Sequence, residues 1–454
     1  MENYSADKIR NIALFGHVGS GKTTLAEAIL FYTKAINRQG RINDGNTTLD
    51  YDPEEIKRQM SVGLSVACCE YKGSKINIID TPGDFDFLGE EMSGIRIADS
   101  GVIMISAKGG TSVGSEKAIR LLNGKKVPFL FFMNRMDEPN ADFEAVAARM
   151  MERYGSSVIP LSFPIMEDGK MTGIVDVMNR KAFSIDKATG KFIEFPLPEE
   201  YNARVDELQE KVNEVVAEAD EELMEKYFAG EKFTEDEFRH GVHAGFREGK
   251  LHPIYCGSAY MNWGVDFLLN CISKDTPPAG KKPALEATLP DGSTQMVSCS
   301  IDDPLVAFCF KTISDPFVGK ISIFKVNAGT LRANSTHFDA NKEGSADCSS
   351  LRERNRSQQT ALQQVISELL QNSPTQIPTI LSVTVRAFLR CLRSSSRSHV
   401  FQSRSFLRRR AMKIRSFPVL QNLQTKIIAL LLRPTLRQSR WFSPVLVICS
   451  SRSS

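Results

Sequence analysis

Short apolar runs separated by polar or glycine-rich turns dominate the first 280 residues of the chain. These runs cover residues 12–15, 76–79, 102–106 and 127–133, whereas residues 23–32 place apolar side chains at helical spacing. Strands that are apolar throughout are typical of parallel sheets buried between helices. The pattern therefore predicts a doubly wound α/β domain over residues 1–280.

The pattern changes further along the chain. Residues 200–250 are highly charged and keep helical spacing. From Pro304 the side chains alternate between apolar and polar, first in LVAFCFKTI and then in GKISIFKV, with turn residues between the two segments. This period of two predicts strands, and we expect residues 285–345 to begin a β-barrel domain.

The clearest chemical signal is the segment GHVGSGKT, residues 16–23, which matches the phosphate-loop pattern GxxxxGK[ST] between a predicted strand and a predicted helix. Its glycines let backbone N–H groups point at phosphate oxygens, and the helix N-terminus favours negative charge. Lys22 is expected to neutralise the β- and γ-phosphates, and the Thr23 hydroxyl to ligate Mg²⁺. The residues expected at the phosphates are Gly16, His17, Val18, Gly19, Ser20, Gly21, Lys22, Thr23 and Thr24.

A second motif, DTPG at residues 80–83, follows the apolar run at residues 76–79. Asp80 is expected to hold Mg²⁺ through water, and the Gly83 N–H to sense the γ-phosphate. We therefore expect Gly83, together with Lys22, to take part in catalysis.

Two further motifs favour GTP over ATP. The segment NRMD, from Asn134 to Asp137, closes another apolar run. The Asp137 carboxylate can accept both the N1–H and the N2–H₂ of guanine, which adenine does not offer. Ser258 and Ala259, in the segment GSA, can supply a backbone N–H to guanine O6. The four motifs come in this order, and each follows an apolar strand. Asn134 and Asp137 in particular disfavour a metabolic P-loop ATPase.

Together these residues resemble elongation factor G and its close paralogues, and the resemblance covers residues 1–345. Residues 50–62 resemble the first switch of that family, whose Mg²⁺-ligating position falls on Ser61. Residues 150–250 resemble its inserted subdomain, and residues 310–320 resemble the opening of its second domain. The resemblance implies an α/β P-loop GTPase domain with a helical insert, followed by the start of a translation-factor β-barrel.

Two positions depart from the family pattern. Asp84 stands where the family usually has the histidine that helps to position the attacking water. A carboxylate there would repel the γ-phosphate unless it turns outward or orients water differently. Arg135 replaces the usual lysine, but its stem can still pack beside the base, so we expect GTP preference to survive. With Ser61, these departures favour a paralogue over the housekeeping translocase, and they put histidine-type hydrolysis in question.

Composition narrows the class of protein. The apolar fraction of 42% and the charged fraction of 24% are ordinary for a globular protein. The chain has no run of eighteen apolar residues and no apolar signal core at its start, so we expect a cytoplasmic protein without a membrane span. The nine cysteines form no CxxC pair, which indicates reduced thiols rather than a zinc site or a disulfide framework.

The end of the chain differs from the rest. Residues 346–454 hold eighteen Lys and Arg against three acids, whereas residues 1–345 hold thirty-nine against fifty-one. After Gly344 there is no glycine in 110 residues, although the turns of a barrel need glycine. A disordered basic tail is one explanation, but its apolar runs, TKIIALLL and SPVLVICS, are unusual for disordered tails.

A shifted reading frame explains the tail better. In a shifted frame, each new codon consists of the third base of one original codon and the first two bases of the next. The printed amino acids then nearly fix the last two bases of the new codon, and only its first base can be chosen. Residues 363–373, 412–431 and 441–454 then become AGDIGAVAKL, EDKIFSGLAEFADEDNRFAL and VLSGLGDMQLEVV. The first string resembles the second domain of elongation factor G, the third resembles its third domain, and all three come in the family's order. We therefore expect residues 346–454 to be an out-of-frame tail without a native fold, not a nucleic-acid-binding arm.

The sequence thus predicts a cytoplasmic, monomeric GTPase of the elongation factor G type that uses GTP, GDP and Mg²⁺. Its expected partners, in the intact form, are ribosomal RNA and ribosomal proteins, without DNA or membrane. One alternative is a GTP-dependent switch that hydrolyses slowly or not at all because of Asp84. Another is a ribosomal-protection factor of the tetracycline-resistance type, which shares this architecture.

Overall fold

The computed structural model describes residues 4–185, 192–281, 284–288, 294–303, 305–315, 319–330, 336–338, 342–344 and 447–449. They belong to one compact unit, which takes in residues 1–371 and 446–454. A second unit, residues 372–445, lies outside the described residues. The predicted out-of-frame tail therefore lies outside them too, apart from three residues.

A seven-stranded sheet forms the centre of the α/β domain. Its spatial order is β2 (Ser65–Tyr71), β3 (Ser74–Asp80), β1 (Ile9–Phe15), β4 (Ser100–Ser106), β5 (Phe129–Asn134), β11 (His252–Cys256) and β6 (Val158–Pro160). Neighbouring strands are parallel except β2, which runs antiparallel to β3. The four apolar runs fall within β1, β3, β4 and β5, which confirms the prediction of a buried parallel sheet, although β5 begins two residues later than its run.

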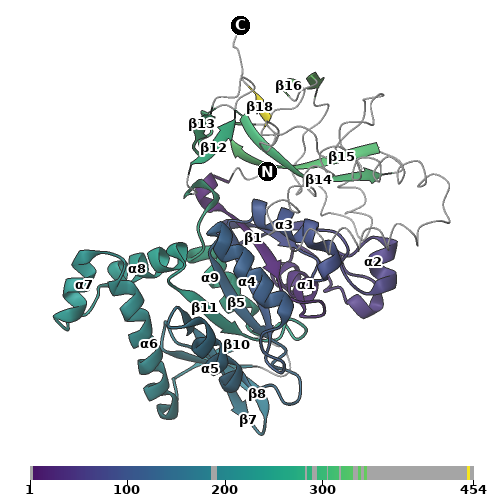
Figure 1. The fold of residues 1–454 in the computed structure, drawn as a ribbon. Coiled ribbons are helices and arrows are strands. Elements are labelled where there is room, and N and C mark those ends of the chain that lie inside the picture. Colours follow the sequence, from purple (N-terminus) through teal and green to yellow (C-terminus); the bar gives the residue numbers. More distant parts are fainter. Residues whose placement is uncertain are drawn as a thin grey trace, which may run out of the picture. The chain divides into compact units, whose positions relative to one another are not determined.

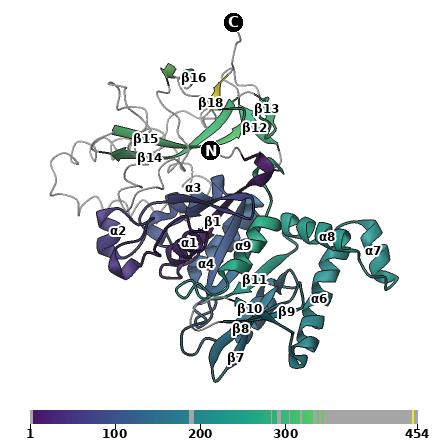
Figure 2. The same ribbon diagram turned by 180° about the vertical axis from the view of Figure 1, so that it is seen from behind.

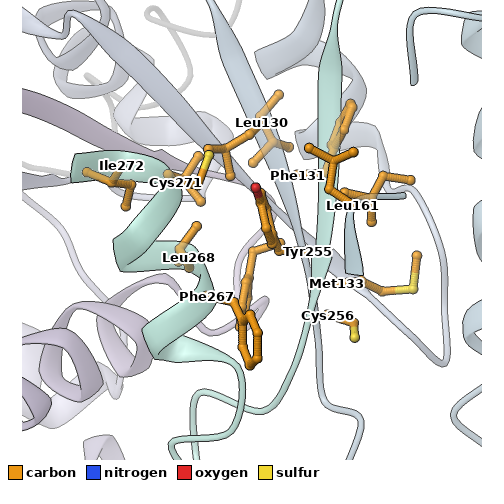
Figure 3. Packing of buried hydrophobic residues seen from close by; sticks show 14 of the residues in the cluster. Leu130, Phe131, Met133, Leu161, Tyr255, Cys256, Phe267, Leu268, Cys271 and Ile272 are labelled. Carbon is orange, nitrogen blue, oxygen red and sulfur yellow. The ribbon is translucent and has the colours of Figure 1, made fainter. Parts of the chain in front are cut away.

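Helices flank this sheet in both views (Figures 1 and 2). They are α1 (Lys22–Tyr32), α2 (Pro53–Arg58), α3 (Leu88–Ile97), α4 (Val113–Lys125), α5 (Phe143–Tyr154) and α9 (Val265–Lys274). Helix α1 packs against α9, and α3 packs against α4. In Figure 3, Leu268 and Cys271 of α9 lie beside Tyr255 of β11, and all three side chains are buried. This apolar packing holds the carboxyl ends of β5 and β11, where two of the predicted motifs begin.

The insert between α5 and β11 is mixed rather than only helical. Its charged stretch forms α6 (Asn202–Ala217), α7 (Glu221–Phe228) and α8 (Glu235–Glu248), which lie at the opposite end of the domain from α2 (Figure 1). Before them comes an antiparallel sheet of β7 (Ser162–Glu167), β8 (Lys170–Asp176), β9 (Lys181–Ile185) and β10 (Phe192–Phe195). The expected helices are present, and the sheet was not foreseen, since its strands are only four to seven residues long.

The segments after the α/β domain form strands, as their alternation predicts. Strands β14 (Leu305–Asp315) and β15 (Gly319–Ala328) pair antiparallel, and β14 also pairs over three residues with β18 (Val447–Cys449). Two further hairpins join β12 (Leu285–Thr288) to β13 (Thr294–Val297), and β16 (Thr336–Phe338) to β17 (Lys342–Gly344). Short 3₁₀ turns lie at Ala6–Lys8 (η1), Ile42–Asp44 (η2), Phe85–Phe87 (η3), Glu199–Tyr201 (η4) and Ala279–Lys281 (η5). Within the part of the chain that the structure describes, no helix has the length and apolar character needed to cross a membrane.

Candidate nucleotide-binding site

Residues 16–21 form a tight loop between β1 and α1. Gly19 and Gly21 have φ angles of 73° and 97°, in the region that L side chains rarely adopt. A Cβ on Gly21 would lie only 2.4 Å from Asn134 Nδ2. Helix α1 begins directly after the loop, so the free N–H groups of its first turn face the same space. The sequence therefore folds here into a backbone cradle for an anion.

The Lys22 side chain folds back over this loop. It is 5% exposed, and its Nζ donates to the carbonyl oxygens of Gly16 and His17, each at 3.1 Å. Burial lowers the pKa of Lys22, while the nearby Asp80 carboxylate acts in the opposite direction. The ammonium group thus lies at the loop, as a phosphate-binding lysine requires.

The other predicted loop residues have distinct surroundings. The Ser20 N–H donates to the His17 carbonyl at 3.1 Å, which closes the turn. The His17 ring lies 6.1 Å from the Phe85 ring of the DTPG region. Val18 is 39% exposed, and Thr24 is half-buried in the first turn of α1.

The three predicted metal ligands meet at the start of α1. The Thr23 hydroxyl donates to Asp80 Oδ2 at 2.6 Å and lies 3.0 Å from the Ser61 hydroxyl. Asp80 is 1% exposed, and its Oδ1 makes no hydrogen bond among the described residues. A buried carboxylate oxygen without a partner, beside two hydroxyl groups, fits a hard divalent cation such as Mg²⁺.

A second buried carboxylate, Asp50, joins this cluster and was not foreseen from the sequence. Burial and, to a lesser extent, the neighbouring Glu55 carboxylate raise the pKa of Asp50 to about 6. Burial and the Asp50 charge together raise the pKa of Asp80. Concentrated negative charge of this kind strengthens the case for a cation. The sequence signal was an acid directly after Leu49 in the switch-like segment, which the family pattern alone did not single out.

Glu55 supports the same cluster from α2. Its Oε1 accepts the N–H groups of Val62 and Gly63 at 2.9 and 3.0 Å, and its Oε2 accepts the Asp52 N–H in a capping box. Because these bonds fix the backbone just after Ser61, Glu55 positions the hydroxyl that lies beside Thr23.

Gly83 packs directly against the phosphate loop. A Cβ at this position would lie 2.3 Å from Lys22 Nζ and 2.7 Å from the His17 carbonyl carbon, so only glycine allows this approach. Its neighbour Asp84 caps the short turn η3, since its carboxylate accepts the Asp86 N–H at 2.9 Å. The Asp84 carboxylate is therefore engaged by the backbone of its own segment.

The NRMD and GSA segments lie side by side. The Asn134 amide donates to the Ser20 carbonyl at 3.0 Å and accepts the Ala259 N–H at 2.9 Å. The Met136 N–H donates to the Gly257 carbonyl at 3.1 Å. One buried asparagine thus joins the phosphate loop to both segments predicted to bind guanine.

The other residues predicted to bind guanine lie in the two segments that this asparagine joins. Arg135 has a φ of 70°, donates to the Gly19 carbonyl and forms an ion pair of 3.2 Å with Glu138. Asp137 is exposed, whereas Ser258 is fully buried. The Ser258 hydroxyl accepts the Met261 N–H at 3.1 Å, which closes the GSA turn. The structure therefore brings all four motifs to the carboxyl ends of β1, β3, β5 and β11, the edge where doubly wound sheets bind ligands.

Comparison with known proteins agrees with this geometry. Residues 7–195 match the family described as the elongation factor Tu GTP binding domain. This part of the chain is a GTP-binding domain of the elongation factor Tu type. A crystal structure of a protein from Thermus thermophilus is similar to the chain, with 32% identity and a TM-score of 0.65. The match covers 73% of this chain and 47% of that one, so the chain spans about half the length of this relative.

Proposed function

We propose that the chain is a translation-factor GTPase of the elongation factor G type, which in its intact form acts on the ribosome as a cytoplasmic monomer. The observation that carries the proposal is the meeting of four nucleotide motifs at one edge of a sheet, in a domain of the elongation factor Tu type. The resemblance of residues 310–320 to the second domain of elongation factor G supports the narrower assignment. Ribosomal RNA and ribosomal proteins would then be its partners.

GTP would bind with its phosphates over residues 16–24. The loop N–H groups and the start of α1 would receive their negative charge, and Lys22 would exchange its two carbonyl partners for phosphate oxygens. Asp137 would accept N1–H and N2–H₂ of guanine, while the Ala259 N–H would exchange its Asn134 acceptor for guanine O6. Mg²⁺, held by Thr23 and Ser61 and through water by Asp80, would neutralise phosphate charge.

The proposed reaction is in-line attack of water on the γ-phosphorus. A new oxygen–phosphorus bond forms as the bond to the bridging β–γ oxygen breaks, and the products are GDP and phosphate. Lys22 and the Gly83 N–H would stabilise the charge on the γ-phosphoryl oxygens, because both lie at the phosphate loop. The water-positioning group is the open part of this mechanism, since Asp84 occupies the usual histidine position.

A second candidate is a GTP-dependent switch that hydrolyses slowly or not at all. Asp84 favours it, because its carboxylate is held by the Asp86 N–H of its own segment and adds negative charge beside Gly83, which is expected to sense the γ-phosphate. Both candidates share the same nucleotide site.

Binding and hydrolysis can be tested separately. Calorimetry with GTP, GDP and ATP tests the site, and we expect tight guanine binding with little affinity for ATP. Equal binding of GTP and ATP would refute the guanine assignment. Single-turnover hydrolysis with and without ribosomes then separates the two candidates, because only the translation-factor GTPase requires acceleration by ribosomes.

A further inference from the structure

The segment Gln39–Arg41, which precedes the switch-like region, contacts the guanine side of the site. Gln39 Nε2 donates to the Ala259 carbonyl at 3.0 Å, and Asn262 Nδ2 donates to Gln39 Oε1 at 2.8 Å. The Arg41 guanidinium lies 3.6 Å from the centre of the Tyr260 ring and donates to the Tyr260 carbonyl at 3.5 Å. Four contacts thus join two segments that lie far apart in the sequence.

The segment Gln39–Arg41 is itself firmly held. The Gly40 N–H donates to Glu27 Oε2 at 3.0 Å, and Glu27 is fully buried on α1. Glu27 also accepts the Thr48 hydroxyl at 3.2 Å, so one carboxylate fixes both ends of the loop. A Cβ on Gly40 would lie 2.5 Å from Thr47 Cα, so the backbone packs too closely for any other residue. The segment is therefore a rigid support that is anchored on the helix beginning at the phosphate loop.

Ala259 is fixed from two directions. Its N–H donates to Asn134 Oδ1, and its carbonyl accepts Gln39 Nε2. Asn262, with a φ of 61°, ends the same turn and bonds to the other end of the Gln39 amide. A side-chain amide that donates to one residue and accepts from another defines the spacing between them. Gln39 therefore sets the orientation of the residue whose N–H is assigned to guanine O6.

We propose that Gln39 and Arg41 are positioning residues for guanine recognition, which hold Ala259–Asn262 in the geometry that the base requires. The inference rests on the proposed GTP-binding function. Gln39 does this through the two ends of its amide, and Arg41 through the face and carbonyl of Tyr260. Both residues contact Ala259–Asn262, the segment assigned to the base, so we expect their loss to act on base binding and to leave the chemical step unchanged.

The test measures release of a fluorescent GDP analogue from the full chain after a chase with excess GDP. Gln39→Ala removes both hydrogen bonds that hold Ala259 and Asn262, so we expect release about tenfold faster. Gln39→Glu retains the acceptor for Asn262 but sets a carboxylate oxygen against the Ala259 carbonyl, so its effect should be at least as large as that of Gln39→Ala. Arg41→Ala should accelerate release severalfold. The exposed neighbours Asn37 and Arg38 provide matched controls, and Asn37→Ala and Arg38→Ala should release GDP like the wild type.

Three further measurements distinguish the loss of a contact that positions Ala259–Asn262 from a general loosening of the structure. The single-turnover hydrolysis constant at saturating GTP should stay at the wild-type value, while selectivity for GTP over ATP falls. Asn262→Asp combined with Gln39→Ala should be less than additive, because both variants break the same bond. Wild-type release rates in the Gln39 and Arg41 variants would overturn the inference, as would a parallel fall in melting temperature and hydrolysis. Failure of the wild type to bind GDP would instead refute the proposed function itself.

Discussion

At the residue scale, Lys22 is the first test of the phosphate loop. Its ammonium group is held at the loop by the Gly16 and His17 carbonyls, so Lys22→Ala removes the cation of the loop together with these two bonds. We expect this variant to lose tight binding of GTP and GDP, as measured by calorimetry. Lys34→Ala, at an exposed position, is the control and should bind normally. A Lys22→Ala protein that binds GTP as well as wild type would mean that the phosphates lie elsewhere.

Guanine selectivity is expected to rest on Asp137. The change Asp137→Asn presents a donor to guanine N2–H₂ where a carboxylate oxygen had accepted it. Loss of such a paired contact costs on the order of 1–3 kcal/mol, so GTP affinity should fall about tenfold or more. Xanthosine nucleotides, which carry an oxygen at that position, should bind better to the variant than to the wild type. Competition titrations with GTP and XTP measure both effects, and unchanged preference for GTP would contradict the assignment.

Asp84 is the residue on which the proposed hydrolysis is expected to depend most. The carboxylate adds like charge near an anionic transition state and is engaged by the Asp86 N–H. We therefore expect Asp84→His to raise the ribosome-stimulated single-turnover rate in an intact, frame-corrected protein. Asp86→His, two residues further on, controls for the introduction of an imidazole. A rate that stays equal or falls in Asp84→His would indicate that Asp84 itself positions water, or that another residue does so.

Local spacing explains which site residues the sequence could predict. Lys22 and Thr23 stand at fixed positions in one continuous motif, so the pattern finds them. Gln39 forms a hydrogen bond with Ala259, which lies 220 residues further along the chain, and neither segment contains a pattern that predicts this contact. Glu27 is likewise an ordinary helix residue by pattern, and only its complete burial marks it as a support. Residues predicted to contact the ligand are therefore visible in the sequence, whereas the residues that would support them depend on the tertiary fold.

At the element scale, apolar runs locate the strands but not their full length. Strand β1 begins at Ile9, three residues before its apolar run. The added residues include Arg10, which donates to the Ser273 carbonyl, and Asn11, which bonds to Asp99. Polar side chains can occupy a central strand when tertiary partners satisfy them, and the sequence alone does not reveal those partners.

The capping of α2 gives a prediction for Mg²⁺ dependence. Glu55→Gln retains one acceptor oxygen but weakens the bonds to the Val62 and Gly63 N–H groups, so the Ser61 hydroxyl loses its fixed position. Mg²⁺ slows the release of GDP, and we expect the variant to need an Mg²⁺ concentration about tenfold higher for the same slowing. The reason is that hydrogen bonds to a charged acceptor contribute on the order of 1.5–3 kcal/mol. Glu54→Gln, on the exposed face of the same helix, should leave the Mg²⁺ titration unchanged. Identical titrations for Glu55→Gln and the wild type would contradict this support role.

At the scale of the whole molecule, the sequence predicted the nucleotide domain far better than the remainder. Parallel strands with motifs at their carboxyl ends impose one topology, so four short patterns define the site. After residue 281 the described strands form separate small sheets, of which the largest has three strands. A barrel depends on strand pairing between distant segments, and alternation in one hairpin does not specify those partners.

The tail carries the final prediction. If residues 346–454 are out of frame, they hold no selected hydrophobic pattern to extend the sheet of β15, β14 and β18, whose outer strand β15 has no further partner among the described residues. Unpaired strand edges promote aggregation, so we expect the 454-residue chain to express poorly. A truncation ending at Pro278 retains all four motifs and should be soluble and bind GTP.

Restoring the frame near codons 345–352 should give a longer soluble protein that contains AGDIGAVAKL and SGLGDMQLEV. Sequencing the gene across this junction is the decisive measurement, because the shifted codons must spell both strings without a stop. The same strings cannot arise from a basic arm selected to bind RNA, since selection would act on the frame that encodes its arginines. Stop codons or unrelated residues in the shifted frame would therefore make residues 346–454 a genuine basic extension, and its binding to nucleic acid would become the question to test.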